Sequence, residues 1–198
     1  MRQQLDEQIF ESRDIHFLPE YELGNISKKG TPYEYRMDEN KYPFKAIYEA
    51  ASLSGKRGKK IIEQQIELLK NKDSIVRYWA ITGLRCQDKT SLKSNKKMLM
   101  KAMEDPYPQV SISASAILWQ HFKENGAEDT LKQYCLDDNM DLALMAINSL
   151  LYIEEKMTFV PTIEKVRQKE NLNYNVKAAC MDFLGSLGIV ENSPDNEQ

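Results

Sequence analysis

Two groups of basic residues have the spacing that best suits binding chemistry. Each group places four cations in a short stretch of chain, and the eight residues are Lys56, Arg57, Lys59, Lys60, Lys93, Lys96, Lys97 and Lys101. The second four recur at helical offsets, which predicts that they share one helix face. If the two carrier helices stack side by side, both groups would meet on one edge and attract a polyanion such as a sulfated glycan. A solvated face without a ligand is the alternative interpretation.

Nucleic acid fits these cations less well. Binding of single strands uses aromatic residues interleaved with the charges, and neither basic group contains one. The formal net charge of -3 gives no overall attraction to nucleic acid or to an anionic membrane. The Gly55–Lys60 stretch is also too short for a nucleotide-binding loop and lacks the preceding strand. We therefore expect no nucleic-acid and no membrane partner.

The sequence contains no group of residues whose types and spacing would form a catalytic site. His16 and His121 lie in different parts of the chain, and no histidine has metal-ligand spacing. Asp137 and Asp138 are interpreted as turn and cap residues. The cysteine count is odd, which argues against a disulfide framework, and each cysteine is interpreted as a small buried residue: Cys86, Cys135 and Cys180. The sequence predicts no catalytic residue, no cofactor and no metal.

An internal repeat predicts how these residues are positioned. An aliphatic residue recurs at intervals of 34, 32 and 34 residues, at Val76, Val110, Leu142 and Val176. A small side chain follows each after four residues, at Ala80, Ala114, Ala146 and Cys180. A leucine follows after eight, at Leu84, Leu118, Leu150 and Leu184. These offsets lie on one helical face, so each segment is predicted to be an inner helix that neighbouring helices approach closely.

More polar helices and turns separate the inner helices. Outer helices are predicted at Lys59–Lys70, Ser91–Glu104, Ala127–Leu136 and Phe159–Lys169. Turns rich in Asp, Asn or Pro precede the inner helices and would cap them. The sequence thus predicts an all-α solenoid of about four helical hairpins over residues 43–188, with a starting helix at Pro43–Leu53. An irregular N-terminal strap over 1–42 precedes it, and a disordered tail over 189–198 follows.

The second helix of the first hairpin resembles the HEAT repeat. Its run from Asp73 to Leu84 contains Asp, then Val-Arg, then Ala and Leu at the offsets of that signature. The resemblance implies a polar ladder that uses Asp73 and Arg77. Lys177 could replace the arginine in a later repeat, whereas Ser111 and Ala143 cannot. The tetratricopeptide pattern is absent.

The order of motifs along the chain resembles the C-terminal region of bacterial sulfatases of the arylsulfatase or N-sulfoglucosamine-sulfohydrolase type. The matching motifs are Arg13-Asp-Ile-His-Phe-Leu-Pro-Glu20, Pro32-Tyr-Glu34, Lys41-Tyr-Pro43 and Val76-Arg-Tyr-Trp-Ala80. The resemblance implies an accessory solenoid packed on a catalytic domain that uses calcium and formylglycine. The Cys/Ser-x-Pro-x-Arg sequence of that catalytic domain is absent at all seven prolines. No catalytic role is therefore carried over to this chain, which we expect not to be an enzyme.

The resemblance leaves three functional interpretations open. The chain is an accessory domain that contacts a sulfatase domain, another protein or a sulfated polysaccharide. Alternatively, the natural full-length product is a sulfatase that hydrolyses sulfate esters or N-sulfates of glycans, with Leu5–Phe10 as the end of its catalytic domain. The third interpretation is a free-standing HEAT adaptor. No signal peptide is visible near Met1, and a sulfatase parent would be periplasmic or on the cell surface.

Overall fold

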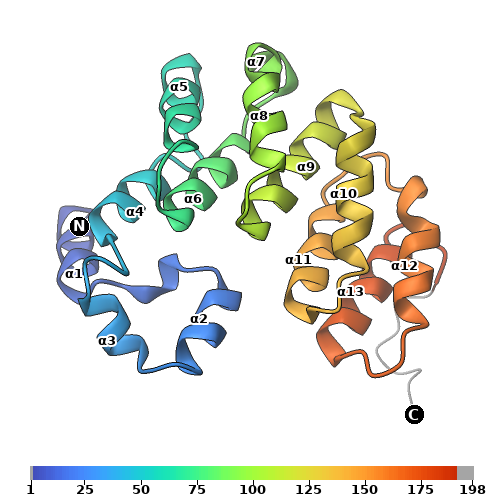
Figure 1. Ribbon diagram of the computed structural model, residues 1–198. Helices are drawn as coiled ribbons and strands as arrows, with labels where there is room; N and C mark the ends of the chain where they lie inside the picture. The colour runs from blue at the N-terminus through green and yellow to red at the C-terminus, as the bar shows by residue number, and fades with distance from the viewer. Residues whose placement is uncertain (1, 191–198) are drawn as a thin grey trace. The chain divides into compact units, whose positions relative to one another are not determined.

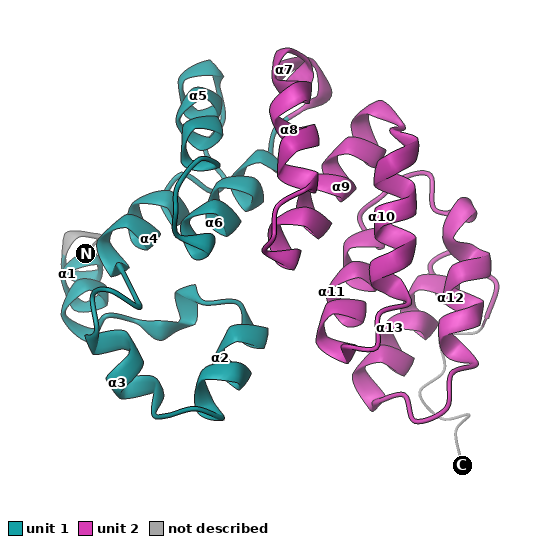
Figure 2. Ribbon diagram, in the orientation of Figure 1, with its two compact units in different colours: residues 1–87 teal, residues 88–198 magenta. Residues whose placement is uncertain are grey.

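Every regular element in the described part of the chain is a helix. The computed structural model describes residues 2–190, and the elements within this range are α- and 3-10 helices without a strand (Figure 1). The predicted all-α class is confirmed. Most of the predicted disordered tail, residues 191–198, lies outside the described residues. The chain divides into two compact units, residues 1–87 and 88–198 (Figure 2); the predicted boundaries at residues 42 and 188 stay predictions.

The first unit packs two helices against a third. Its elements are α1 (Arg2–Ser12), η1 (Ile15–Phe17), α2 (Glu20–Ser27), α3 (Pro32–Met37), α4 (Phe44–Ala51), α5 (Lys59–Leu68) and α6 (Ser74–Leu84). Both α4 and α5 contact α6, which has the most apolar sequence of the three. The starting helix and the first predicted hairpin therefore lie together in one unit.

The second unit continues the alternation of polar and apolar helices. Its elements are α7 (Lys89–Leu92), η2 (Lys93–Asn95), α8 (Lys96–Met103), α9 (Pro108–Phe122), α10 (Asn125–Cys135), α11 (Met140–Leu150), η3 (Met157–Phe159), α12 (Val160–Arg167) and α13 (Tyr174–Gly185). α8 and α10 pack on α9, α11 packs between α9 and α13, and α12 packs on α13. The three inner helices of this unit thus contact one another in chain order.

The repeated apolar stripe is buried in all four predicted inner helices. No side chain of the stripe is more than 8% exposed, and its members are Val76, Ala80, Leu84, Val110, Ala114, Leu118, Leu142, Ala146, Leu150, Val176, Cys180 and Leu184. α9 is buried on nearly every side, since each residue from Gln109 to Trp119 is buried. The prediction that these segments are helices with a buried apolar stripe is confirmed; their role as inner helices of a solenoid stays a prediction.

The predicted turn residues cap three of the four inner helices. The side chains of Asp73, Asn139 and Asn173 each accept at least one hydrogen bond from a backbone N–H of the following first turn. These acceptors satisfy donors that the helix itself leaves unpaired. α9 begins differently, with Pro108 as its first residue and no side-chain cap. Proline has no N–H to satisfy, so its place at this position removes one of the unpaired donors.

The N-terminal segment differs from the irregular strap predicted for residues 1–42. It contains α1, α2 and α3, and α2 and α3 are only eight and six residues long. Local signals explain α3: the Thr31 hydroxyl accepts a hydrogen bond from the Glu34 N–H (3.1 Å), and Pro32 occupies its first position. Helices this short show no extended amphipathic period, which is why the sequence pattern did not predict them.

The outer segment Ser91–Glu104 is also more broken than predicted. The chain forms α7, the single turn η2 and then α8 instead of one helix. Ser94 and Asn95 lie at the interruption. Short polar side chains compete with the backbone for hydrogen bonds and lower helix propensity, which accounts for a break at this point.

Replacement of Leu118 by alanine is expected to lower the free energy of unfolding by about 2 to 5 kcal/mol, because the fully buried side chain leaves a cavity in α9. Urea denaturation followed by circular dichroism measures the change. Lys97→Ala, at an exposed position of α8, is the control and should be neutral. An unchanged transition midpoint for Leu118→Ala would show that the repeat register is misaligned.

Candidate functional site

The first basic group forms an exposed loop in the first unit. We call residues Gly55–Lys60 the basic loop; it comprises the end of the connection from α4 and the first two residues of α5, and its four cations are all exposed: Lys56, Arg57, Lys59 and Lys60. The backbone at Gly55 and Gly58 has φ of 79° and 111°. Glycine adopts these angles without the strain that a Cβ atom introduces. The two glycines therefore permit the chain to turn within the six residues that carry the four cations.

Two buried glutamines hold the chain on either side of Gly55, at the start of this turn. The Gln65 Nε2 group donates a hydrogen bond to the Leu53 carbonyl (3.1 Å), and the Gln87 Nε2 group donates to the Lys56 carbonyl (2.8 Å). Gln87 Nε2 also lies 3.3 Å from Gln65 Oε1. Both side chains are almost completely buried. We call this pair the glutamine clamp; it fixes the Leu53 backbone to α5 and the Lys56 backbone to the turn that follows α6.

A glycine in α6 makes room for the clamp. A Cβ atom at Gly83 would lie 2.3 Å from Gln65 Nε2, so the carboxamide packs directly on the helix backbone at this residue. Glycine in a helix interior is less favourable than alanine by about 1 kcal/mol. This close approach is the physical reason for its presence. Gln65 and Gln87 were not predicted from the sequence, because isolated glutamines carry no periodic signal.

The second basic group lies in the other unit and is less uniform. Lys93 belongs to η2, whereas Lys96, Lys97 and Lys101 belong to α8. Lys96 is half-buried: its Nζ lies 2.6 Å from Glu124 Oε2 and 5.6 Å from the ring centre of Phe122. The other three lysines are exposed. The two groups belong to separate units, and the prediction that they share one edge stays a prediction.

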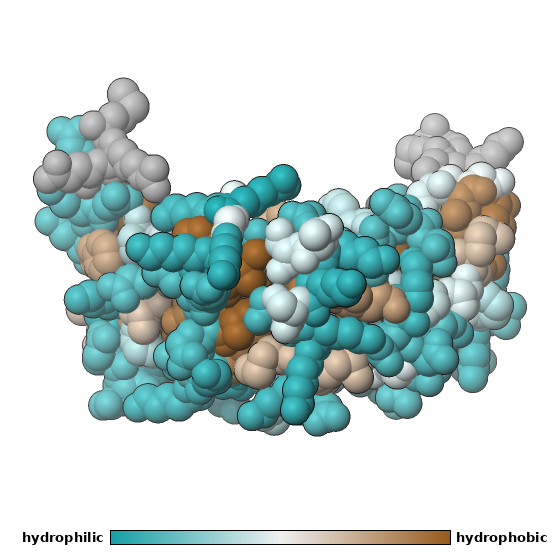
Figure 3. Space-filling model, turned by 90° about the horizontal axis from the view of Figure 1, so that it is seen from above, coloured by the Kyte–Doolittle hydropathy of each residue, from teal (hydrophilic) through white to brown (hydrophobic). Residues whose placement is uncertain are grey.

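The surface is hydrophilic over most of the face shown in Figure 3, with smaller apolar areas between the polar ones. In the first unit, exposed large apolar side chains gather in the N-terminal helices: Leu5, Phe10, Tyr33 and Met37. In the second unit they are Tyr152, Met157, Tyr174 and Ile189. Both units therefore expose apolar groups besides the basic ones.

An aromatic cluster attaches the N-terminal segment to the first unit. Phe10 and Phe17 pack edge-on against Phe44 and Tyr48 of α4, with ring centres 4.7 to 5.7 Å apart. The Trp79 indole of α6 donates a hydrogen bond to the Phe17 carbonyl (2.8 Å). Aromatic pairs in this geometry add stability beyond the burial of their area. The aromatics of the segment thus pack on the chain's own helices.

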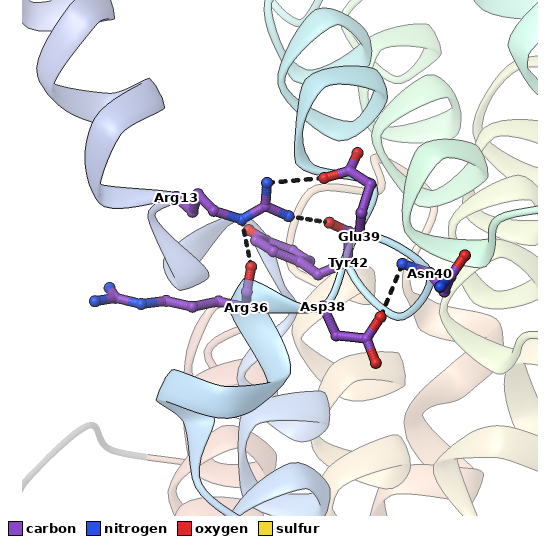
Figure 4. A network of polar contacts seen from close by, with 6 residues as sticks. All are labelled: Arg13, Arg36, Asp38, Glu39, Asn40 and Tyr42. Atoms are coloured by element: carbon purple, nitrogen blue, oxygen red, sulfur yellow. Dashed lines mark hydrogen bonds and ion pairs between the residues drawn. The ribbon is translucent and has the colours of Figure 1, made fainter.

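Arg13 is the centre of a polar network beside this cluster (Figure 4). Its Nη1 donates to the Glu39 carboxylate (2.8 Å), its Nη2 to the Tyr42 carbonyl (2.7 Å) and its Nε to the Arg36 carbonyl. Tyr42 is buried, and its hydroxyl donates to the Asp14 carbonyl (2.5 Å). Burial and the charge of Asp14 raise the pKa of Tyr42. The network ties the segment to the start of α4, and we interpret it as structural.

The other residues that could do chemistry are dispersed. His16 is exposed and its Nδ1 lies 2.9 Å from Asp14 Oδ1; burial raises the pKa of Asp14, but hydrogen bonds from His16 outweigh it and lower that pKa overall. His121 lies in the second unit, in α9. No group of three potential metal ligands occurs among the described residues.

The cysteines differ in exposure. Cys135 and Cys180 are fully buried, which confirms the interpretation made for them, whereas Cys86 is partly exposed. Burial raises the pKa of both buried thiols, that of Cys180 to about 11. A raised pKa keeps a thiol protonated near neutral pH, and the thiolate is the nucleophile.

A hollow of about 360 Å³ lies between α2 and α3 and was not predicted from the sequence. Its lining carries both signs of charge and includes Glu22, Lys29, Glu34, Tyr35 and Lys41. Two of these charges are already engaged, because Lys41 pairs with Asp38 and the Glu34 carboxylate accepts from Thr31. The lining thus lacks a surplus of either charge that would select a ligand.

Comparison with known proteins gives no relative from which a function could be transferred. No family model, no curated protein and no solved structure gave a match to the chain. Among residues 2–190, no helix combines the length and the apolar character needed to span a bilayer. The candidate site therefore rests on the geometry of this chain.

The glutamine clamp predicts a pH-dependent effect of Gln65→Glu. The new buried carboxylate would face the Leu53 carbonyl without a donor, and we expect a loss of about 3 kcal/mol of unfolding free energy near neutral pH. Burial raises the pKa of the new carboxyl group above its unfolded value of about 4.3. The loss should therefore grow as pH rises and shrink as pH falls toward about 5, where the protonated group can again donate a hydrogen bond.

Urea denaturation near neutral pH and at about pH 5 measures this effect. Gln64→Glu places the same change on an exposed neighbour in α5 and should leave the unfolding free energy nearly unchanged at both pH values. Equal, pH-independent losses in the two variants would show that Gln65 makes no buried hydrogen bond.

Proposed function

We propose that this chain is a non-catalytic, HEAT-like helical-repeat domain that serves as an accessory interaction surface of a sulfatase-type protein. The observation that carries the proposal is the burial of the same stripe in four helices at a spacing of 32 to 34 residues. Repeat arrays of this kind stack layer on layer and leave an extended surface for partners.

The polar contacts of the repeats also support a HEAT-like array. Arg77 Nη1 donates to the carbonyls of Asn71 and Lys72 (3.0 and 3.1 Å), which belong to the turn before its own helix. In the next repeat, Ser111 takes the place of this arginine, and its hydroxyl donates to the Met103 carbonyl of α8 (2.6 Å). Different side chains thus link the turn or the outer helix to the inner helix, so the departure from the HEAT signature leaves the pairing of helices intact.

The accessory role is supported by the N-terminal segment. Its motifs resemble the sulfatase C-terminal region, and its inner side is fixed by the aromatic cluster and by Arg13. Leu5, Tyr33 and Met37 remain 54 to 61% exposed on α1 and α3. Exposed apolar groups of this kind suit contact with a second domain. A catalytic domain of the sulfatase type is the partner that we propose for them.

The non-catalytic part of the proposal rests on the sequence and on the state of the thiols. The formylglycine motif of sulfatases is absent at every proline. The buried Cys135 and Cys180 have raised pKa values, which disfavours a nucleophilic thiolate. A sulfatase parent and a free-standing adaptor remain alternatives, and the DNA upstream of Met1 separates them: an in-frame catalytic domain indicates the parent, and a stop codon favours the adaptor.

The purified chain is expected to hydrolyse no 4-nitrophenyl sulfate above the no-protein background, with or without added Ca²⁺, because it contains no formylglycine precursor motif. Release of nitrophenol measured by absorbance provides the readout, and a known arylsulfatase is the positive control. Calcium-dependent turnover that follows the protein through gel filtration would contradict the proposal.

A further inference from the structure

The basic loop carries a concentration of unpaired positive charge. Lys56, Arg57, Lys59 and Lys60 take no part in any ion pair between described residues. The next carboxylates along α5 are Glu63 and Glu67, and Glu67 pairs with Lys70 (2.6 Å). The loop is therefore strongly positive in a chain whose formal net charge is -3.

This arrangement is unfavourable for the folded chain by itself. Lys59 and Lys60 occupy the first turn of α5, where positive charge opposes the helix dipole. Four neighbouring cations also repel one another. Neither the helix nor the core is stabilised by these charges, and a bound anion would remove the repulsion.

The glutamine clamp fixes the backbone at Lys56 and just before the basic loop, at Leu53, without using the cations. Gln65 and Gln87 bind the Leu53 and Lys56 carbonyls from the buried side, while the four charged side chains stay exposed. A surface whose backbone is fixed before binding loses less conformational entropy when a ligand arrives. The second basic group does not present four unpaired cations, since Lys96 is already neutralised by Glu124.

We propose that the basic loop is a preformed binding site for a linear sulfated polysaccharide. The inference rests on the proposed role of the chain as an interaction surface and names the chemistry of one partner. A polymer with closely spaced sulfates would contact several of the four cations at once. Nucleic acid fits less well, because the loop contains no aromatic side chain on which a base could stack.

Heparin affinity chromatography of the full chain tests the proposal. The wild-type chain should be retained at about 0.1 M salt, where charges within about 10 Å still interact. The double variant Lys56→Ala/Arg57→Ala should elute at lower salt and bind a heparin oligosaccharide about tenfold more weakly in calorimetry, at roughly threefold for each lost charge. The matched control Lys97→Ala/Lys101→Ala removes the same charge from the second group and should shift elution much less.

Two further measurements distinguish binding at the basic loop from a loss of folding and from binding of any polyanion. The thermal unfolding temperature should be unchanged or slightly raised in the loop variant, since removal of two of the four cations lowers their mutual repulsion. Polyuridylate should compete for the loop less well than heparin.

No retention of the wild-type chain, equal shifts in the two double variants, or equal competition by polyuridylate would overturn the proposal. None of these outcomes bears on the sulfatase assay or on the upstream DNA, so the two proposals can fail separately.

Discussion

The small, fully buried side chain at the centre of each inner helix is the constraint on which the rest of the structure depends. Ala80, Ala114, Ala146 and Cys180 occupy this position and have no measurable exposure. A side chain of this size lets two helix backbones approach closely, and the flanking aliphatic residues then fill the space on either side. α9 shows the result, because neighbouring helices leave it buried on almost every side. The enclosed α9 contains no Asp, Glu, Lys or Arg, so charged residues are displaced from this helix to the outer helices, the turns and the connecting loops.

This displacement explains why the candidate site is a loop. Chemistry-bearing side chains have no place on the buried stripe, whereas a connection between two helices can vary its length and charge without disturbing the core. The basic loop uses this freedom, but it is not a loose connection, because buried amides hold its backbone. A buried polar group is tolerated only when it is hydrogen-bonded. Gln65 meets that condition by binding the Leu53 carbonyl and the Gln87 amide, and Gly83 provides the room.

The features that the sequence predicts well are those that repeat. The stripe recurs four times, so each copy supports the assignment of the others, and Asp73, Asn139 and Asn173 mark helix starts by a purely local interaction. The glutamine clamp neither recurs along the chain nor depends on a local interaction. It joins residues 22 positions apart through single hydrogen bonds, and a glutamine in a polar helix has the composition of a surface residue. Gly83 was recognised as part of an inner helix, but only the position of Gln65 explains why it must be glycine.

The N-terminal segment is a second case in which the sequence predicts a feature but not the residues that it contacts. The sequence predicted a strap at residues 1–42, but not the surface on which it packs. Phe10 and Phe17 cover α4, the first helix of the predicted array, and Arg13 fixes the segment through three separate acceptors. Helical arrays need their terminal layers covered, since an inner helix without a neighbour exposes its apolar face. The segment covers α4 in this way, while Leu5, Tyr33 and Met37 of α1 and α3 stay exposed. The same short segment thus combines aromatic residues that pack on the chain's own helices with apolar residues that this packing leaves exposed.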